Sequence, residues 1–312
     1  MAFLVEIKKR IEAVQNTRKI TKAMELVAAS RMRAFQKKAL GTRAYAWGLL
    51  DALSAHHEQL AELSWSEPRD SSLPVLFVIL TSDKGLCGSL NQQLLRFLWR
   101  APEWTSLAPE QRLLVTIGRK SGEAAGHAGI PTAEQLDGIS ETLDPLGALP
   151  VIEKIVGFWI RKECREIVLI SPHYVNPFVF HPTLKRYLPF SLGMIESHLG
   201  WKRAGLGAPS DGNGGQTTEA DPLPSERLMF LEPSREDVLD ALVRQVIQSV
   251  FLQAFYELKA TEYSSRMIAM KNATEAADKR LQDFTHEYHK VRQGAITQQL
   301  AELVGGGAAL DS

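Results

Sequence analysis

The placement of proline constrains this chain more than any other feature. All fifteen prolines lie between Pro68 and Pro233 of a chain of 312 residues. Proline removes a helical hydrogen-bond donor and clashes with the preceding turn, at a cost of ~3 kcal/mol or more inside a helix. Residues 1–67 and 234–312 contain no proline and are rich in strong helix formers such as Ala, Leu, Glu and Lys. The two ends are therefore predicted to be helical, and the middle is predicted to be something else.

The predicted terminal helices are too long for a compact domain. A helix over about Phe3–Leu63 would be roughly 90 Å long and one over Ser234–Val304 roughly 105 Å long. Helices that project this far need a partner for their apolar stripe, and each can serve the other. The apolar spacing predicts an antiparallel coiled coil with a seam at these positions: Leu4, Ile7, Ile11, Val14, Leu281, Phe284, Tyr288 and Val291.

Both seams are predicted to slip out of frame. In the first helix the heptad frame continues onto polar residues (Arg18, Thr21, Glu25), while apolar residues continue one position away (Ile20, Met24, Val27). In the last helix the stripe passes through Ala295 and restarts at Ile296, Leu300 and Leu303. Such slips change supercoiling locally, so an irregular pair is expected.

The middle of the chain has the pattern of an α/β domain. Short aliphatic runs predict buried strands at Leu73–Asp83, Arg112–Gly118 and Glu166–Ser171, and helical stretches lie between them at Ser89–Arg100 and Leu146–Arg165. The predicted fold is a Rossmann-like α/β domain combined with a long antiparallel coiled coil.

The end of this region is predicted to lead into the last helix. Arg227–Ser234 is a predicted late strand with Ser234 as the helix N-cap, and Gly205–Ser225 is a predicted flexible loop with five glycines. The predicted domains are an N-terminal helix (1–67), an α/β domain (68–233) and a C-terminal helix (234–312).

Composition limits the classes of protein that fit. The chain has 36 basic and 36 acidic residues, and its longest unbroken apolar run, Val75–Leu80, is far shorter than a spanning helix. The two cysteines, Cys87 and Cys164, lie 77 positions apart and form no paired-ligand spacing. A soluble protein of a reducing compartment such as the cytoplasm is expected.

A loop after the first strand invites a nucleotide-binding interpretation. "TSDKGLCGSLN" (Thr81–Asn91) follows a predicted strand but matches neither glycine-rich phosphate-binding motif. We therefore expect a tight turn in which Gly85 and Gly88 supply unusual backbone angles. Cys87 near the helix start is interpreted as structural, because no second cysteine or neighbouring histidine supports a nucleophile.

Other candidate side chains also support no reaction. His286 and His289 could share a helix face, but their spacing is not that of a zinc-binding H-E-x-x-H motif, and a solvated face is expected. Asp83, Glu141 and Asp144 are acidic, but no sequence pattern brings them together. The sequence predicts no catalytic residue, no cofactor and no metal.

Charge and an apolar tip are the remaining signals. Residues 1–43 carry three acidic residues against eleven basic ones, so the first helix is basic within a neutral chain. This predicts an acidic partner, and the apolar Ile20, Met24, Val27 and Met32 favour a protein over nucleic acid or lipid. At the other end, Ala295–Leu310 carries only Glu302 as a charge, so a partner is expected to cover it. The eleven basic residues are Lys8, Lys9, Arg10, Arg18, Lys19, Lys22, Arg31, Arg33, Lys37, Lys38 and Arg43.

Several motifs together resemble the gamma subunit of F-type ATP synthases, in the family's order and over nearly the whole chain. "IKKRIEAVQNTRKITKAMELVAASRMRAFQ" (Ile7–Gln36) resembles its N-terminal signature and "TSDKGLCGSLN" its loop motif. "SSRMIAMKNATEAADK" and "VRQGAITQQLAELVGGGAAL" resemble its C-terminal signature. Gln299 departs from the acid common in that signature, and the redox-regulated cysteine insert of chloroplast members is not evident, which points to a bacterial-type enzyme.

The resemblance implies a non-catalytic rotor shaft that couples a membrane ring to ATP synthesis or hydrolysis. The implied partners are three alpha and three beta subunits around one copy of this chain, with epsilon and the ring of c subunits at the α/β domain. The implied place is the cytoplasmic face of the inner membrane, reached only through the complex. By motif match, the implied contacts with the beta subunits are Lys22, Met24, Arg292, Gln293 and Thr297.

Two other classes of function stay open from the residues alone. A cytoplasmic coiled-coil adaptor with an α/β docking domain predicts a stable homodimer that needs no alpha or beta subunits. A nucleotide-dependent enzyme using the turn at Thr81–Asn91 predicts nucleotide binding by the isolated chain.

Overall fold

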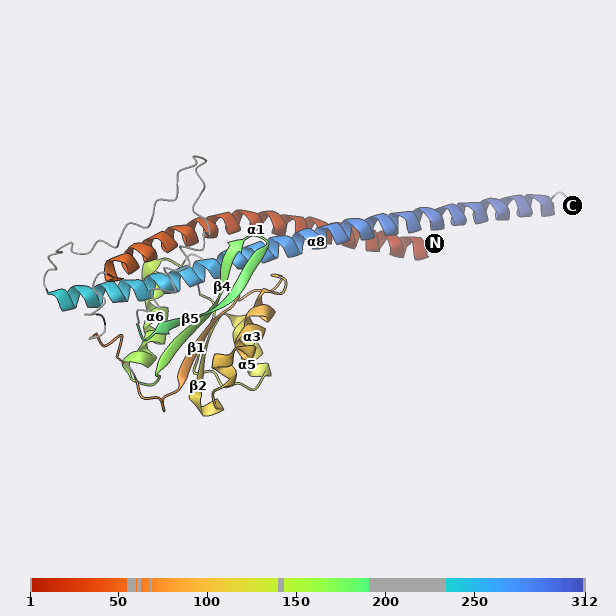
Figure 1. The fold of residues 1–312 in the computed structure, drawn as a ribbon. Coiled ribbons are helices and arrows are strands. Elements are labelled where there is room, and N and C mark those ends of the chain that lie inside the picture. The colour runs from red at the N-terminus through yellow and green to blue at the C-terminus, as the bar shows by residue number, and fades with distance from the viewer. Residues whose placement is uncertain are drawn as a thin grey trace, which may run out of the picture. The chain divides into compact units, whose positions relative to one another are not determined.

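The computed structural model describes residues 2–54, 60, 63–67, 69–139, 143–190 and 234–310. Its first and last elements are the long helices α1 (Ala2–Ser54) and α8 (Arg235–Leu310), drawn in red and blue in Figure 1. The chain forms two compact units, one of residues 1–30 with 266–312 and the other of residues 31–265. The predicted domain limits at residues 67 and 233 are a different division and stay a prediction.

The larger unit contains a five-stranded sheet in the order β3-β2-β1-β4-β5. The first four of these strands run parallel, and β5 pairs antiparallel with β4 at the edge. Figure 1 shows α3 and α5 on one side of the sheet and α6 on the other. The strands are β1 (Val75–Leu80), β2 (Arg112–Ile117), β3 (Glu134–Leu136), β4 (Glu166–Asn176) and β5 (Val179–Leu188). The helices between them are α3 (Leu90–Arg100), α4 (Pro102–Thr105), the short 3-10 helix Pro109–Gln111, α5 (Arg119–His127) and α6 (Pro145–Ile160).

The predicted α/β architecture is confirmed. All six residues of β1 are buried, as expected for a central parallel strand with both faces covered. β4 extends to Asn176, beyond the predicted end at Ser171, and α6 ends at Ile160 instead of Arg165. The helix predicted through Leu63 is also too long, because residues 63–66 form a turn. The predicted strand over residues 227–233 and the loop 205–225 lie outside the described residues.

The start of α8 is where the sequence predicts it. The backbone N–H of Asp237 donates to Oγ of Ser234 at 3.1 Å, so Ser234 is the N-cap. Ser234 in turn donates to Oδ2 of Asp237 at 2.6 Å. The cap and the acidic residues of the first turn both favour a helix beginning at Arg235.

At the junction of β1, β2 and α5 the backbone requires a glycine, and replacing this glycine tests the fold. Gly118 has φ +93°, and a Cβ there would lie 2.2 Å from the carbonyl oxygen of Thr81. Gly118→Ala is therefore expected to lower the free energy of unfolding by roughly 2–6 kcal/mol, from backbone strain and overpacking together. The measurement is urea unfolding of the full chain followed by circular dichroism.

A second glycine in α5 is the matched control. A Cβ at Gly126 would meet nothing within 4 Å, so Gly126→Ala is expected to leave stability unchanged or raise it by about 0.5–1 kcal/mol. Equal unfolding midpoints for the two variants would contradict the described junction.

The smaller unit is an antiparallel pair made by the first part of α1 and the last part of α8. Thr274 Oγ1 donates to Thr21 Oγ1 at 2.8 Å, and Arg18 forms an ion pair with Asp278 one turn along. Residue numbers fall on one helix as they rise on the other, so the predicted antiparallel coiled coil is confirmed. The predicted seam residues of both helices are buried or half-buried between exposed neighbours.

The slip predicted in α1 is wrong. The original heptad frame continues onto Thr21 and Ala28, which are only 9% and 1% exposed, while Ile20 and Val27 are 60% and 57% exposed. Small residues can occupy the seam here because the two helices lie close together. Thr21 and Thr274 are joined directly by a hydrogen bond, so no bulky side chain is needed between the helices. The apolar residues outside the frame instead form a second, outward surface.

Candidate functional site

The proposed contact residues on α1 lie on the outer side of the smaller unit. Lys22 is exposed, and its Nζ bonds both carboxylate oxygens of Glu25 at 3.0 Å. Met24 is half-buried beside the seam. The exposed apolar residues near them are Ile20, Leu26 and Val27. This part of α1 therefore presents a mixed basic and apolar surface, as the sequence predicts.

The proposed contact residues on α8 lie far along the helix from this surface. Arg292, Gln293 and Thr297 are all exposed, and the Thr297 hydroxyl donates to the carbonyl of Gln293 at 3.0 Å. Since Thr274 is the residue opposite Thr21, Arg292 lies 18 residues further along α8, or about 27 Å at ~1.5 Å per residue. The candidate residues thus form two groups at different positions along the axis of the coiled coil.

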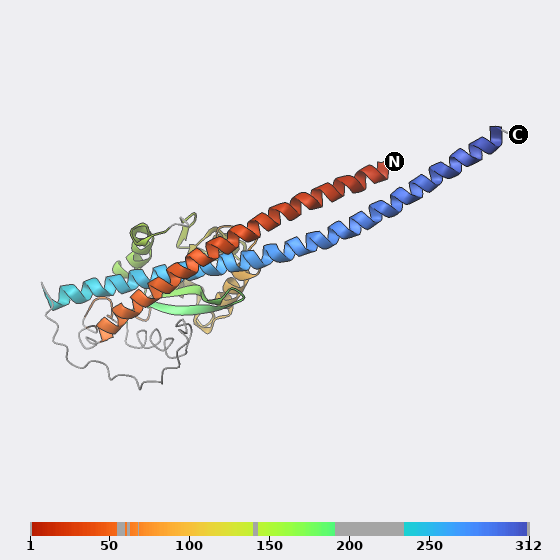
Figure 2. The same ribbon diagram turned by 90° about the horizontal axis from the view of Figure 1, so that it is seen from above.

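The end of α8 continues past the beginning of α1. The pairing of Thr21 with Thr274 and of Arg18 with Asp278 places Leu4 opposite the turn near Val291. Residues of α8 beyond that turn outrun α1, and Figures 1 and 2 show the C-terminal end projecting alone. Ile296 and Leu300 are accordingly 43% and 57% exposed. The apolar stripe that was predicted to restart there faces outward in this chain.

Part of the predicted basic charge is neutralised within the helices. Arg10 pairs with Glu6 at 2.6 Å, Lys22 with Glu25 and Arg18 with Asp278. Within the described part of the chain, Lys8, Lys9 and Lys19 have no ion-pair partner and are exposed. These lysines keep the N-terminal helix attractive to an acidic surface.

The loop Thr81–Asn91 is a packed turn. Gly88 has φ +60°, as predicted, but Leu86, not Gly85, is the second residue with positive φ, at 63°. Cys87 is 2% exposed, and the Asn91 side chain donates to its sulfur at 3.3 Å. Asn91 also donates to the Ser82 hydroxyl at 2.8 Å. The side chains of Ser82, Cys87 and Asn91 therefore bond one another and close the turn.

Two of the candidate acidic residues accept hydrogen bonds at the starts of two different helices. Asp83 accepts from the backbone N–H of Arg119 at 3.0 Å, at the start of α5. Asp144 accepts from the N–H of Gly147 at 2.7 Å as the N-cap of α6. Glu141 lies outside the described residues.

The two histidines of α8 do not form a metal site in the described structure. His286 and His289 are both exposed, and His289 lies edge-on to the ring of Tyr288. Among the residues that the structure describes, no group of three His, Cys, Asp or Glu side chains could hold a metal ion.

Burial predicts that Cys164 does not react in the folded chain. Its side chain is 0% exposed, and desolvation raises the pKa of the thiol to about 12. The thiolate is the reactive form, so alkylation by iodoacetamide at pH 8 is expected to be negligible until the chain unfolds. Mass spectrometry of alkylated peptides with and without urea measures this, and modification of Cys164 in the native chain would contradict the described packing.

The most unusual part of α8 is its passage through the larger unit. Every residue from Phe251 to Ser264 is buried, so the helix is covered on all sides over almost four turns. On the α1 side, the ring of Phe35 stacks on Tyr263 with centroids 5.7 Å apart and lies 6.4 Å from Tyr256. An 18-residue window of α8 is apolar enough to span a membrane, but 61% of it is buried in the structure, which is typical of a core helix.

A buried carboxylate joins this segment to the sheet. Glu257 is 1% exposed, and its carboxylate accepts at least three hydrogen bonds. Two come from β4, from His173 Nδ1 at 2.9 Å and from the backbone N–H of Tyr174 at 3.2 Å. The third comes from Gln253 Nε2 at 3.0 Å. The β4–β5 register shifts between Tyr174 and Asn176, so the N–H of Tyr174 is turned toward α8.

Further hydrogen bonds fix α8 at other levels. The Tyr187 hydroxyl of β5 donates to the carbonyl of Ile247 at 2.7 Å, and burial raises the pKa of that phenol. Tyr256 donates to the carbonyl of Leu143 at 2.8 Å. Trp65 donates to Asp240 at 2.6 Å. We call Glu257, His173, Tyr187, Tyr256 and Trp65 the α8 anchor. It prevents this part of α8 from turning independently of the sheet.

Sequence reasoning missed the α8 anchor. Its signal is the presence of Gln253, Glu257, Lys259 and Glu262 within an otherwise apolar and aromatic stretch of helix. Lys259 and Glu262 form an ion pair at 3.1 Å with side chains only 5% and 3% exposed. Charged residues in such a stretch indicate buried partners.

Comparison with known proteins identifies the family. The family model described as ATP synthase matches residues 4–310. The chain is 32% identical to the ATP synthase gamma chain of Herpetosiphon aurantiacus, with 100% of both chains covered. It is 33% identical to the ATP synthase gamma chain of Methylococcus capsulatus, with 99% of this chain and 100% of that one covered.

Solved structures share the fold. A chain in the Euglena gracilis mitochondrial ATP synthase structure of OSCP, F1 and c-ring matches with a TM-score of 0.65 and 16% identity, covering 99% of this chain and 95% of that one. A chain of the central stalk and c-ring of the Tetrahymena thermophila enzyme matches with a TM-score of 0.55 and 22% identity, covering 81% and 99%. The match over the whole length, together with the sequence identity, shows that this chain belongs to the ATP synthase gamma-chain family, whose members are the non-catalytic central shaft of that rotary enzyme.

Proposed function

We propose that this chain couples rotation to catalysis through two surfaces on its coiled coil. The lower surface contains Lys22 and Met24 with the exposed Ile20, Leu26 and Val27, and the upper one contains Arg292, Gln293 and Thr297. Both contact the beta subunits of a ring of three alpha and three beta subunits that surrounds one copy of the chain. The α/β unit is the foot, which contacts epsilon and the c-ring.

The complex is membrane-associated, and we propose that this chain lies at the cytoplasmic face of the inner membrane, attached only through its partners. A division of the chain into an N-terminal helix (1–67), an α/β foot (68–233) and a C-terminal helix (234–312) fits this role. Each terminal segment then contributes one helix to the shaft.

The observation that carries the proposal is the continuity of α8. One helix of 76 residues contains both the upper contact residues and the buried segment held by the α8 anchor. A torque applied to the foot therefore reaches the coiled coil through covalent backbone and through hydrogen bonds at several levels, without a hinge of loop residues in α8.

The contacts must be numerous to drive the catalytic sites. Moving a two-state site from 1:99 to 99:1 requires ~5.5 kcal/mol, whereas one exposed ion pair supplies ~0–1 kcal/mol. Two surfaces about 27 Å apart on a stiff rod supply more contacts than either surface alone. They also act on the ring at two levels at once.

Rotation can be observed directly, because the foot accepts a specific label. Phe178 is 79% exposed in the turn between β4 and β5, while Cys87 and Cys164 are buried. Phe178→Cys therefore allows a biotin and a bead to be attached at one place on the foot of an immobilised complex with alpha and beta subunits. ATP is expected to drive the bead in one direction, with pauses that follow the threefold symmetry of the ring.

The unmodified chain, which should carry no bead, is the control for labelling. A labelled complex that hydrolyses ATP while the bead shows only random motion would contradict the rotor function. A labelled chain that elutes as a homodimer and does not join alpha and beta subunits would favour the adaptor function instead.

A further inference from the structure

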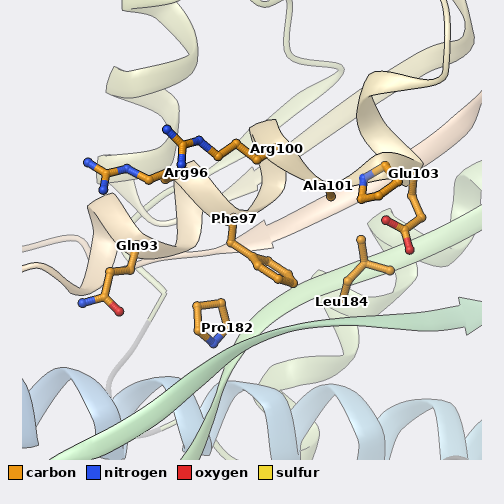
Figure 3. A pocket seen from close by; sticks show the side chains of 9 residues that line it. Gln93, Arg96, Phe97, Arg100, Ala101, Glu103, Pro182 and Leu184 are labelled. Carbon is orange, nitrogen blue, oxygen red and sulfur yellow. The ribbon is translucent and has the colours of Figure 1, made fainter.

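A cavity lies in the larger unit, between α3 and the edge strand β5. Its volume is about 510 Å³. Phe97 of α3 and Pro182 and Leu184 of β5 contribute an apolar lining, and Figure 3 shows Phe97 directed toward Pro182. All three side chains are only half-buried. The cavity therefore offers apolar surface that a ligand can still remove from water.

Two arginines border this cavity. Arg96 and Arg100 are one helical turn apart on α3, are both exposed, and leave the helix side by side in Figure 3. They also line a second cavity of about 390 Å³ on the α5 side of α3. α3 contains no acidic residue. The two guanidinium groups thus form a concentrated positive charge, and in Figure 3 both extend away from Phe97 and Leu184, toward the end of the cavity that Gln93 lines.

These arginines differ from others of the same unit. Within the described ranges, Arg96 and Arg100 make no hydrogen bond or ion pair, and α3 itself offers them no carboxylate. Like charges one turn apart on a helix are unfavourable by a few tenths of a kcal/mol. An external anion would relieve that repulsion. Arginines of the unit that do bond a carboxylate or a backbone carbonyl include Arg112, Arg119, Arg161, Arg165, Arg186 and Arg244.

The distribution of charge orients a ligand in the cavity. Guanidinium groups bind phosphate and carboxylate groups through paired, charge-assisted hydrogen bonds. Glu103 also lines the cavity, and in Figure 3 it lies at the opposite end from Arg96. A second anionic group at that end would be repelled. The site therefore fits one anionic head at the arginines and an apolar body beyond it.

We propose that the cavity between α3 and β5 binds an amphiphilic anion. Its phosphate or carboxylate is held by Arg96 and Arg100, and its hydrocarbon part packs on Phe97, Pro182 and Leu184. The same chemistry is offered by a free acyl or alkyl anion and by an acidic lipid in a membrane. This site is independent of the contacts proposed for the coiled coil.

The test measures binding of octyl phosphate, below its critical micelle concentration, to the full chain by isothermal titration calorimetry. Arg96→Ala combined with Arg100→Ala is expected to weaken binding at least about tenfold, since one charge-assisted hydrogen bond already contributes that much. Leu184→Ser is expected to weaken it severalfold by removing apolar contact.

The matched control removes two arginines from elsewhere in the same unit. Arg161 and Arg186 each form one exposed ion pair, with Glu163 and Glu166. Arg161→Ala combined with Arg186→Ala gives the same change in net charge and should leave octyl phosphate binding unchanged. Circular dichroism melting of each variant shows that the fold is retained, and loss of binding in both double variants would overturn the proposal.

Further probes identify the source of the anion and the need for both of its parts. Inorganic phosphate and the uncharged octyl glucoside should each bind much more weakly than octyl phosphate. Vesicles of phosphatidylcholine with phosphatidic acid, if bound in an Arg96- and Arg100-dependent way, indicate a membrane lipid, and binding of octyl phosphate alone indicates a free amphiphile. Equal affinity for octyl glucoside, or exclusion of octyl phosphate from the chain in the assembled complex, would overturn the proposal.

Discussion

Replacing Glu257 with alanine is expected to lower the free energy of unfolding of the larger unit by roughly 3–5 kcal/mol, because it leaves buried polar groups without their acceptor. His173, the N–H of Tyr174 and the Gln253 amide all donate to this one carboxylate. Water cannot easily replace the lost carboxylate as hydrogen-bond acceptor, since the side chains of His173 and Glu257 are only 5% and 2% exposed. Urea unfolding of the full chain measures the loss.

Two further variants separate the hydrogen bonds from packing. Glu257→Gln keeps the shape and one acceptor oxygen, so it should lose less stability than Glu257→Ala. Glu153→Ala removes an exposed glutamate from α6 and should change stability by less than about 0.5 kcal/mol. A Glu257→Ala chain as stable as the Glu153→Ala chain would contradict the α8 anchor.

Glu257 also links the fold to function. In the proposed function, torque passes from the foot to the shaft through the segment of α8 that the α8 anchor holds. In membranes, a Glu257→Gln complex that still assembles is expected to lose ion-driven ATP synthesis more than ATP hydrolysis, because synthesis depends on force entering at the foot. A ratio of the two rates equal to that of the unchanged complex would count against this function of Glu257.

Replacing Arg292 and Gln293 together with alanine is expected to reduce ATP hydrolysis and synthesis about tenfold or more without preventing assembly. Interface arginines that pair on binding commonly contribute 2 kcal/mol or more. In the free chain both residues are exposed. The substitution therefore leaves no buried cavity, and the coiled coil should keep its stability. Rates are measured on purified complexes of equal subunit composition.

The matched control is the pair Arg280→Ala and Gln282→Ala. It removes the same two residue types from exposed positions of the same helix, at a level that the resemblance does not assign to a contact. These rates should stay close to those of the unchanged complex. Wild-type rates in both directions for the Arg292 and Gln293 variant would contradict the assignment of the upper contact surface.

The positions of the two long helices and of the central strands could be predicted, because each depends on the local sequence. Proline-free ends predict α1 and α8, and the serine cap at Ser234 predicts where α8 begins. The aliphatic runs predict β1, β2 and the start of β4, since buried parallel strands consist of continuous apolar residues.

Strand β5 was missed for the opposite reason. It is an edge strand whose first eight residues are exposed or half-buried, and it contains Pro182 and several polar residues. Proline and charge are tolerated at an edge because one side of the strand has no neighbour. Its position comes from pairing with β4, a long-range contact that no local pattern contains.

The predicted slip in α1 shows the limit of hydropathy within a helix. Ile20 and Val27 are more apolar than Thr21 and Ala28, yet Thr21 and Ala28 are the buried pair. Position in the heptad frame and small size decide which residues lie in the seam. The apolar residues outside the seam are explained by a partner surface, which is a property of the complex and not of the single chain. The α8 anchor was missed because the partners of Glu257 lie 83 and 84 positions away in the sequence.

The most direct test of the shaft function is co-expression of this chain with the alpha and beta subunits of the same host. Gel filtration followed by an ATPase assay, with and without this chain, measures both assembly and activity. We expect one complex of three alpha, three beta and one copy of this chain, with full ATPase activity only when the chain is present. Elution of the chain alone or as a homodimer, with no effect on ATP turnover, would contradict the shaft function.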